Sequence, residues 1–523
     1  MKRFNLKFYF ASLLLAAGLW SCTDLEIEES DSIISTGFQG LADANSAVDG
    51  LYNSVRGQFE NQGNRYSFEE VTADAAIVPT RGTDWGDNGQ WSSLHQHLWT
   101  PEHVFVIGVW NEWNANQLVA SQILDARSNP TPQNIGDASF LRALSMWTIL
   151  DYYGQVPFRD VTLPSSTLPE VISGQAAIDF IISDIDTAIS NLPTTPAASG
   201  EANGRGSKAA ARFLKAKILL NKNVVLGTSA DAGDMAQVIS LVDEITADGY
   251  QLQAGYFDIF RDTPDDETIW SLASGVGNNI FNGLHYNSMS QGGGGWNGFA
   301  TLSEYYDLFE GDPNSNRMQV DFTPLDGQEE RRGGVPPMGD GVLEDSQVGN
   351  GYLIGQQYAA DGTALTDRAG APLTFKRDFK DGDGNLNIIN NDETTGIRVI
   401  KYNPRYGAFN GHKIIFRYAD AYLMKAEAMM RSGGDPTAMV NQLRVLRNAS
   451  PLGTVGETEM LAERGRELFQ EGWRRGDLLR FGQYTRDWLF KAPGSVNNDK
   501  WKLFPIPAAQ ILANPALVQN PGY

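Results

Sequence analysis

Apolar residues recur at helical spacing along much of the chain, most clearly over residues 414–449. The first stripe of that segment places four apolar side chains on one face of a helix: Ala419, Leu423, Ala426 and Met430. Gly433 and Gly434 are expected to end this helix, because glycine accepts the left-handed turn after the last carbonyls. Asp435 can cap a second helix, with Pro436 at its first position and a facing stripe of Met439, Leu443 and Leu446. The segment therefore predicts an antiparallel helical hairpin.

The same periodicity predicts further helices before and after this hairpin. They span residues 41–59, 103–127, 137–153, 175–191, 207–221, 235–247 and 458–483. Residues 67–99 are predicted to be irregular, and from 249 to 411 loops rich in glycine and aspartate dominate. We therefore expect a mostly α chain with a loop-rich middle, in which the hairpin at 414–449 is of the tetratricopeptide type. It divides into an N-terminal helical part (41–248), a loop-rich insertion (249–411) and a C-terminal helical part (412–523).

The predicted helix at 458–483 carries charges of both signs at helical spacing. They are Arg464, Glu467, Glu471, Arg474, Asp477 and Arg480. We interpret them as a structural ion network between helices rather than as a site. Trp110 and Trp113 lie three residues apart on another predicted helix, and we expect both in the core.

The N-terminus indicates export. Lys2, Arg3 and Lys7 precede an apolar run from Phe8 to Trp20, which is the pattern of a signal peptide and is short for a membrane span. Cys22, the only cysteine, follows at once, as in the lipobox of a bacterial lipoprotein. The alternative is an ordinary signal peptide beside an incidental cysteine. We predict that residues 1–21 are removed, that Cys22 is lipidated, and that residues 22–40 form an acidic tether.

The net charge of the chain narrows the classes of molecule that it is expected to bind. The formal net charge is −22 and the pI about 4.6, and such a balance repels phosphate backbones, so nucleic acid is not an expected partner. It also makes a heavily sulfated or uronic ligand less natural. The chain has 12 Trp residues, some of which can serve recognition.

Several segments together resemble the SusD/RagB family, the outer-membrane nutrient-binding lipoproteins of Bacteroidetes. They are Cys22 with its acidic tether, and residues 151–158, 396–404, 417–430, 463–481 and 502–523. The resemblance implies a single SusD-like domain over 41–523, exposed on the outer membrane. It also implies a mostly α fold in which tetratricopeptide-like helical hairpins support a loop-rich ligand-binding face. It implies a TonB-dependent, SusC-like transporter as partner, and a glycan as the usual cargo, although some members bind peptides or glycoproteins. It also implies binding without catalysis.

Two glycine-rich stretches supply the aromatic rings that carbohydrate recognition needs. Residues 81–91 contain Arg81, Asp84, Trp85 and Trp91, and residues 282–299 contain Asn282, Tyr286 and, behind four glycines, Trp296. Sugars offer C–H faces to flat rings and hydroxyls to polar groups. We predict that Trp85 and Trp296 stack on sugar rings while Asp84, Arg81 and Asn282 bind hydroxyls, with Trp91 and Tyr286 as further candidates. Packing in the protein is the alternative for each Trp.

Other chemistry is weakly indicated. Asp381, Asp383, Asn385 and Asn387 alternate like the oxygen ligands of a calcium loop, with Asp392 at the twelfth position, but Leu386 replaces the usual glycine. A structural calcium or a plain Asp/Gly turn both fit. His95, His97 and His103 form at most a weak metal motif. A surface glycoside hydrolase is the enzymatic alternative to a binding protein, although no carboxylate pair stands in a recognisable setting.

Overall fold

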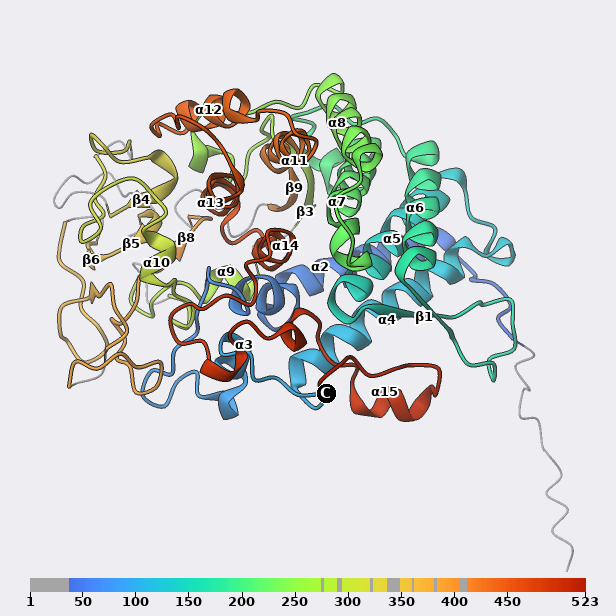
Figure 1. Ribbon diagram of the computed structural model, residues 1–523, viewed down its shortest axis with the longest axis horizontal. Helices are drawn as coiled ribbons and strands as arrows, with labels where there is room; N and C mark the ends of the chain where they lie inside the picture. Colours follow the sequence, from blue (N-terminus) through green and yellow to red (C-terminus); the bar gives the residue numbers. More distant parts are fainter. Residues whose placement is uncertain are drawn as a thin grey trace, which may run out of the picture.

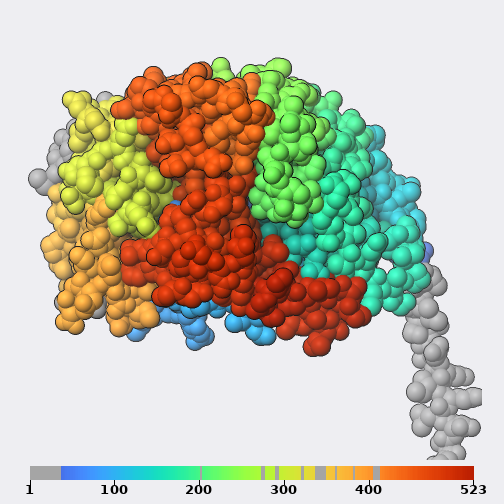
Figure 2. All heavy atoms as spheres, viewed as in Figure 1, coloured from blue at the N-terminus to red at the C-terminus, as the bar shows by residue number. Residues whose placement is uncertain are grey.

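Helices are the main regular elements of the described residues, and short strands and long connections join them. The computed structural model describes residues 37–273, 277–288, 294–319, 323–335, 349–359, 362–380, 383–403 and 412–523. In Figure 1, α4–α8 stand together on one side, α11–α14 occupy the middle, and β4–β8 with their loops lie on the other side. The fold is mostly α, as expected. In the space-filling view the C-terminal residues separate the loop-rich part from helices α6–α8 (Figure 2).

The helices occur in chain order as follows. The N-terminal part contains α2 (Ala44–Glu60), a π-helical turn η1 (Gln62–Val71), α3 (Gln90–His95), α4 (Val104–Leu124), α5 (Pro132–Tyr153), α6 (Gly174–Asn191), α7 (Lys208–Leu226) and α8 (Ala232–Ala247). Among its described residues the loop-rich part contains the short α9 (Asn278–Phe281) and α10 (Ser303–Tyr306) and two 3-10 turns, η5 (Tyr256–Asp258) and η6 (Glu330–Arg332). The C-terminal part contains α11 (Tyr418–Arg431), α12 (Thr437–Leu446), α13 (Glu457–Leu468), α14 (Arg474–Arg480) and α15 (Ala508–Ala513).

The strands pair in small antiparallel sheets. β1 (Gln155–Phe158) pairs with β2 (Glu170–Ser173), and β4 (Gly333–Gly334), β5 (Asn350–Leu353) and β8 (Arg398–Ile400) form a three-stranded sheet. β6 (Gly355–Gln356) pairs with β7 (Thr374–Phe375). β3 (Thr268–Ala273) pairs with β9 (His412–Arg417), with Thr268 opposite Arg417 and Ala273 opposite His412. This last pair joins the two ends of the loop-rich part.

The predicted helices are present, with corrected boundaries. α5 begins at Pro132 rather than at residue 137, because Thr131 caps it and Pro132 fits the first turn. In the hairpin, residues 412–417 form a strand before α11 begins, and Pro436 is the N-cap of α12 while Asp435 accepts a hydrogen bond from the Thr437 N–H. The stretch 67–99, predicted to be irregular, contains the second half of η1 and the short α3.

The predicted helix at 458–483 is in fact two helices. α13 ends at Leu468, and Gln470 and Gly472 take left-handed backbone conformations before α14 begins at Arg474. The carbonyls released by the break are not left without donors. The Lys401 Nζ donates to the Phe469 carbonyl at 2.8 Å, and the Arg417 guanidinium donates to the Glu467 carbonyl at 2.8 Å. Tertiary partners therefore compensate for a break that helical periodicity alone does not reveal.

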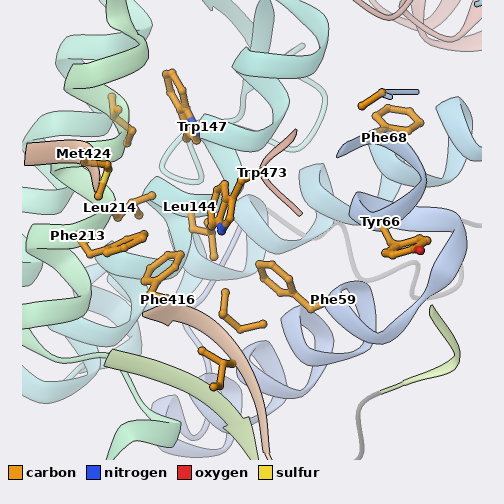
Figure 3. Packing of buried hydrophobic residues seen from close by; sticks show 14 of the residues in the cluster. Phe59, Tyr66, Phe68, Leu144, Trp147, Phe213, Leu214, Phe416, Met424 and Trp473 are labelled. Carbon is orange, nitrogen blue, oxygen red and sulfur yellow. The ribbon is translucent and has the colours of Figure 1, made fainter. Parts of the chain in front are cut away.

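One continuous core runs beneath the helices. Phe213 from α7 stacks on Phe416 from β9, with ring centroids 4.4 Å apart, and Trp473 and Phe59 approach the same cluster from other parts of the chain (Figure 3). Trp110 and Trp113 are 2% and 0% exposed, so their predicted place in the core is confirmed. This core fixes the helical part as a rigid support for the loops.

The charges of the C-terminal helices form a buried network. Glu467 accepts hydrogen bonds from the guanidinium groups of Arg331, Arg417 and Arg447 at 3.1, 2.8 and 3.0 Å. Arg480 in α14 pairs with Glu427 in α11 at 2.7 Å. The structural role predicted for this cluster is confirmed, because its members contact one another across helices and are buried. The guanidinium groups hold the pKa of Glu463 and of Glu427 at about 2 even though burial opposes it.

Candidate functional site

The candidate site lies where two turns of the loop-rich side meet. Trp296 has 65% of its surface exposed, the largest exposure of any Trp among the described residues, and Trp85 is half-buried beside it. The Trp85 Nε1 donates a hydrogen bond to the Trp296 carbonyl at 2.6 Å. The structure therefore brings together the two rings that the sequence analysis selected from distant stretches.

Trp85 is held from behind by other aromatic rings. Its centroid lies 5.5 Å from Phe299 and 5.9 Å from Trp91, and its backbone takes a left-handed conformation with φ of 61°. A β-carbon at Gly298 would lie 2.3 Å from the Trp85 ring, so only glycine permits this approach. Trp85 thus combines a packing role with a partly open ring.

The Trp296 turn is more firmly held than a run of glycines suggests. The Trp296 N–H donates to the Asn282 Oδ1 at 3.3 Å, and the Gly298 N–H donates to the Asn282 carbonyl at 2.8 Å. β-carbons at Gly294 and Gly295 would each lie 1.9 Å from a backbone carbonyl oxygen. These two glycines therefore serve close backbone contact rather than looseness, and the other two of the four lie outside the described residues.

Three predicted ligand residues have structural partners instead. Arg81 is 4% exposed and donates to the backbone carbonyls of Asn297, Asp392 and Thr395. Asn282 is 5% exposed and holds the Trp296 turn. Trp91 is 2% exposed and donates to the Asp87 carboxylate, so protein covers its ring. Their burial gives a sugar no access to them, and we correct the ligand role proposed for these three residues to support of the turns.

Asp84 and Tyr286 remain at the surface and bind each other. The Tyr286 hydroxyl donates to the Asp84 Oδ2 at 2.7 Å. That bond, together with one from Arg368, lowers the pKa of Asp84, whereas burial and then Asp84 itself raise the pKa of Tyr286 to about 12. Asp84 is thus an ionised acceptor and Tyr286 a neutral donor beside the two indoles.

Arg368 is the residue that sequence reasoning missed. Its guanidinium lies 3.8 Å above the Tyr286 ring and donates hydrogen bonds to the carboxylates of Asp84, at 2.7 Å, and Glu393. The second carboxylate oxygen of Glu393 accepts from the backbone N–H of Arg368 at 3.1 Å. The side chain is 49% exposed. Nothing near residue 368 in the sequence signals this role, since its partners lie far away along the chain.

His285 supports Glu393 from the protein side. Its Nδ1 accepts from the Asn287 N–H at 3.1 Å, so its Nε2 carries the proton and donates to Glu393 at 3.2 Å. Burial, aided by Arg398, lowers the pKa of His285 to about 4, so the ring is neutral at pH 7. The histidines of the weak metal motif contact separate backbone carbonyls: His95 that of Leu489, His97 that of Thr72 and His103 that of Gln90.

The calcium prediction depends on residues that are only partly described. Asp381 lies outside the described residues, and Asp383 and Asn385 are exposed. The Asn387 Oδ1 accepts from the Ile389 N–H, as in a turn, and Asp392 pairs with Lys376. Within the described ranges, no group of three His, Cys, Asp or Glu side chains is placed to hold a metal ion, His95, His97 and His103 included. Calcium binding therefore stays a prediction.

Comparison with known proteins finds relatives that match this chain in sequence and in fold. Residues 266–523 match the model of the SusD family. The starch-binding protein SusD of Bacteroides thetaiotaomicron is 26% identical, and the alignment covers 100% of both chains. Two solved structures share the fold: surface glycan-binding protein A from Bacteroides uniformis has a TM-score of 0.67 at 18% identity, covering 91% of this chain and 98% of that one. The corresponding protein from Bacteroides thetaiotaomicron, in complex with laminarihexaose, has a TM-score of 0.62 at 17% identity, with coverages of 91% and 98%.

Proposed function

The chain belongs to the SusD family, whose members bind substrates without transforming them, and from that premise we propose that it captures an oligosaccharide or polysaccharide at the cell surface. We further propose that it delivers this glycan to a TonB-dependent, SusC-like transporter in the outer membrane. Capture and delivery of the glycan both need reversible binding rather than a catalysed reaction. The protein is proposed to act as the receptor of an uptake system.

The observation that carries the proposal is the exposed indole of Trp296. An indole with 65% of its surface in water leaves a large apolar area open to a ligand. A hydrogen bond from the Trp296 backbone N–H to Asn282 holds the turn that presents this ring. A pyranose ring offers the apolar C–H face that fits an indole, and its hydroxyls suit the neighbouring Asp84, Tyr286 and Arg368. Trp85 extends the aromatic surface.

Two lines of comparison support a glycan over other cargo. One relative is named as a starch-binding protein, and one structural neighbour was solved with laminarihexaose. Starch is an α-linked glucan and laminarihexaose a β-linked one, so both linkages belong in the first test. A peptide or glycoprotein ligand is the alternative that the family resemblance leaves open.

The proposed location follows from the N-terminus. The signal sequence and Cys22 predict an acyl anchor in the outer membrane with the domain facing the exterior. Searched over the residues that the structure describes, no helix is both long and apolar enough to cross a bilayer. An anchor on Cys22 followed by an acidic tether would let the domain reach its transporter.

The test uses the chain without residues 1–22 on a glycan array, followed by calorimetry with maltohexaose and laminarihexaose. We expect saturable binding of at least one arrayed glycan and no new reducing ends after prolonged incubation. Release of reducing ends would favour the glycoside hydrolase alternative, and binding of peptides alone would reject a glycan cargo. For delivery, the lipidated protein purified from detergent-solubilised outer membranes is expected to retain a large barrel protein.

A further inference from the structure

We propose that Asp84 and Arg368 act as one unit that recognises two adjacent hydroxyls of a neutral sugar ring stacked on Trp296. This inference rests on the proposed function, because it names the class of glycan and the polar contacts of that same site. It makes Arg368 a specificity-determining residue. It also predicts that the site prefers neutral glycans over uronic or sulfated ones.

The fold holds Arg368 in place from outside the two aromatic turns. β6 and β7 pair at the base of the segment that carries Arg368, and a bridge from Tyr358 to Ala364 joins two stretches of it. Arg368 itself lies in a turn that a bridge from Thr366 to Pro372 closes. At its tip the Asp367 Oδ1 accepts from the N–H groups of Ala369 and Ala371, which fixes the turn around Arg368. The Asn287 amide donates to the Thr366 carbonyl at 2.8 Å and fastens this tip to the Tyr286 turn. Arg368 is thus delivered to the site by a built loop.

The polar groups of the pair leave complementary positions open. The bonds from Tyr286 and Arg368 both fall on the Asp84 Oδ2, and within the described part of the chain no hydrogen bond reaches Oδ1. Arg368 uses its Nε and Nη2 for the two carboxylates, and the rest of its N–H donors belong to a half-exposed side chain. An open acceptor therefore lies beside an open donor.

Adjacent sugar hydroxyls match this arrangement. A hydroxyl can donate and accept at once, so one hydroxyl can donate to the Asp84 Oδ1 while its neighbour accepts from the Arg368 guanidinium. Hydrogen bonds to charged groups are stronger than those between neutral groups. The planar guanidinium is already stacked on Tyr286 and paired on two sides, so little side-chain freedom is lost when the ligand binds.

The charge at this surface favours a ligand without charge. Arg368 stands between Asp84 and Glu393, so the surface group contains one cation and two carboxylates. A ligand carboxylate would have to displace one of them and would meet the other at close range. Arg81 and Arg398 lie beneath, but each is buried and donates to backbone carbonyls. Because they add positive charge to the region, anionic glycans form a necessary arm of the test.

The experiment measures binding by calorimetry with neutral and anionic hexasaccharides: maltohexaose, laminarihexaose, cellohexaose and hexagalacturonate. The variants are Arg368→Met, Arg368→Lys and Asp84→Asn. Arg377→Met is the matched control, because Arg377 makes a similar surface pair with Asp307 outside the site. The wild-type protein is expected to bind a neutral glycan with an affinity that changes less than about twofold between low and high salt.

Arg368→Met is expected to weaken that neutral ligand about tenfold or more, with Arg368→Lys recovering only part and Arg377→Met unchanged. Monodeoxy analogues of the bound sugar separate contact from positioning. The Arg368→Met loss should disappear for the analogue that lacks the contacted hydroxyl, which a purely structural role would not produce.

Three results would overturn the inference. Neutral binding that Arg368→Met leaves within twofold rejects the role of Arg368 while the proposed function stands. Tightest binding to hexagalacturonate, with a steep loss in salt, rejects the neutral preference while a glycan cargo stands. Binding of no glycan on the array or in calorimetry rejects the proposed function, and this inference fails with it.

Discussion

Trp85 donates its indole N–H to the backbone carbonyl of Trp296, a bond between residues 211 positions apart in the sequence. One ring therefore positions the turn that presents the other. Part of the Trp85 ring packs against Phe299, whereas the Trp296 side chain is exposed to solvent. Trp85 supports the turn, and Trp296 is the ring proposed to contact the glycan, so the predictions for the two residues differ.

Trp296→Ala is expected to weaken glycan binding about tenfold or more while leaving stability nearly unchanged. The side chain is 65% exposed, so its loss creates no cavity, but it removes the central aromatic contact of the site. Calorimetry with the cognate glycan and urea unfolding measure the two effects. Leu512→Ala is the control, because Leu512 is 87% exposed on α15 and is expected to change neither quantity. Unchanged affinity in Trp296→Ala would remove this ring from the site.

Gly298→Ala is expected to reduce affinity through Trp85. The added methyl group would lie 2.3 Å from the Trp85 ring, so the ring must shift and its bond to the Trp296 carbonyl must weaken. We expect a loss of affinity of about threefold or more together with about 1–3 kcal/mol of stability. Gly108→Ala in α4 is the matched control: its methyl group meets nothing, and it should stabilise the helix by about 0.5–1 kcal/mol. Full affinity in Gly298→Ala would show that the Trp85 position is not required.

Glu467→Gln is expected to lower the free energy of unfolding by about 3–5 kcal/mol. The carboxylate is fully buried and contacts three guanidinium groups, so its neutralisation leaves those cations without their shared partner. Urea unfolding followed by tryptophan fluorescence measures the loss. Asp499→Asn, which removes an exposed pair with Lys502, should cost less than about 1 kcal/mol. Equal effects of the two substitutions would contradict the structural weight given to the buried network.

Glu70→Gln is expected to stabilise the protein at alkaline pH. Burial raises the pKa of Glu70 to about 8 from an ordinary 4.5, so the folded state keeps a proton that the unfolded chain releases. The contribution of the protonated Glu70 carboxyl to the free energy of unfolding is fully present below about pH 4.5. It is lost as the pH rises toward 8, by about 1.4 kcal/mol per pH unit. The variant lacks this loss, so its advantage should appear near pH 8 and vanish near pH 4. Glu102→Gln, at an exposed position, is the control, and a pH-independent difference for Glu70→Gln would refute the assignment.

Cys22→Ser is expected to release the protein from the outer membrane. Without the thiol no acyl chain can be attached, so the tether no longer links the domain to the membrane. Membrane fractionation and metabolic labelling with a fatty-acid analogue check the outcome. Ser21→Ala leaves the cysteine in place and should keep both the label and the membrane fraction. A labelled, membrane-bound Cys22→Ser protein would exclude Cys22 as the anchor.

The helical part was largely predictable from sequence because its signal is local. Apolar stripes and glycine stops place α11 and α12 within a few residues, and opposite charges at helical spacing identify the buried network. The break between α13 and α14 was not predictable, since the groups that stabilise it belong to Lys401 and Arg417 in distant segments. Local periodicity cannot report such partners.

The candidate site was predictable in part, since Trp85, Trp296, Asp84 and Tyr286 were all selected from the sequence and lie at the surface. Trp85 and Trp296 are conspicuous because large rings seldom stand among glycines without a role. Arg81 and Asn282 carry the same polar chemistry as a ligand contact, but in this fold their donors and acceptors are used by backbone groups of neighbouring turns. Arg368 and Glu393 come from other loops altogether, and their importance is visible only after folding brings them to Tyr286.

The pairing of β3 with β9 has a consequence for how the sequence between these two strands can change during evolution. The chain leaves the helical frame after Ala273 and returns to it at His412, and these two residues are partners in one ladder. The ladder keeps the two ends of that stretch together, but Arg331 and Lys401 within it also donate to Glu467 and to the Phe469 carbonyl of the helical frame, so an exchange there must keep these contacts. Exposed turns such as the one that carries Arg368 can vary while the helices stay unchanged, so transplanting such a turn, with Arg331 and Lys401 left in place, is a practical way to alter the proposed ligand specificity.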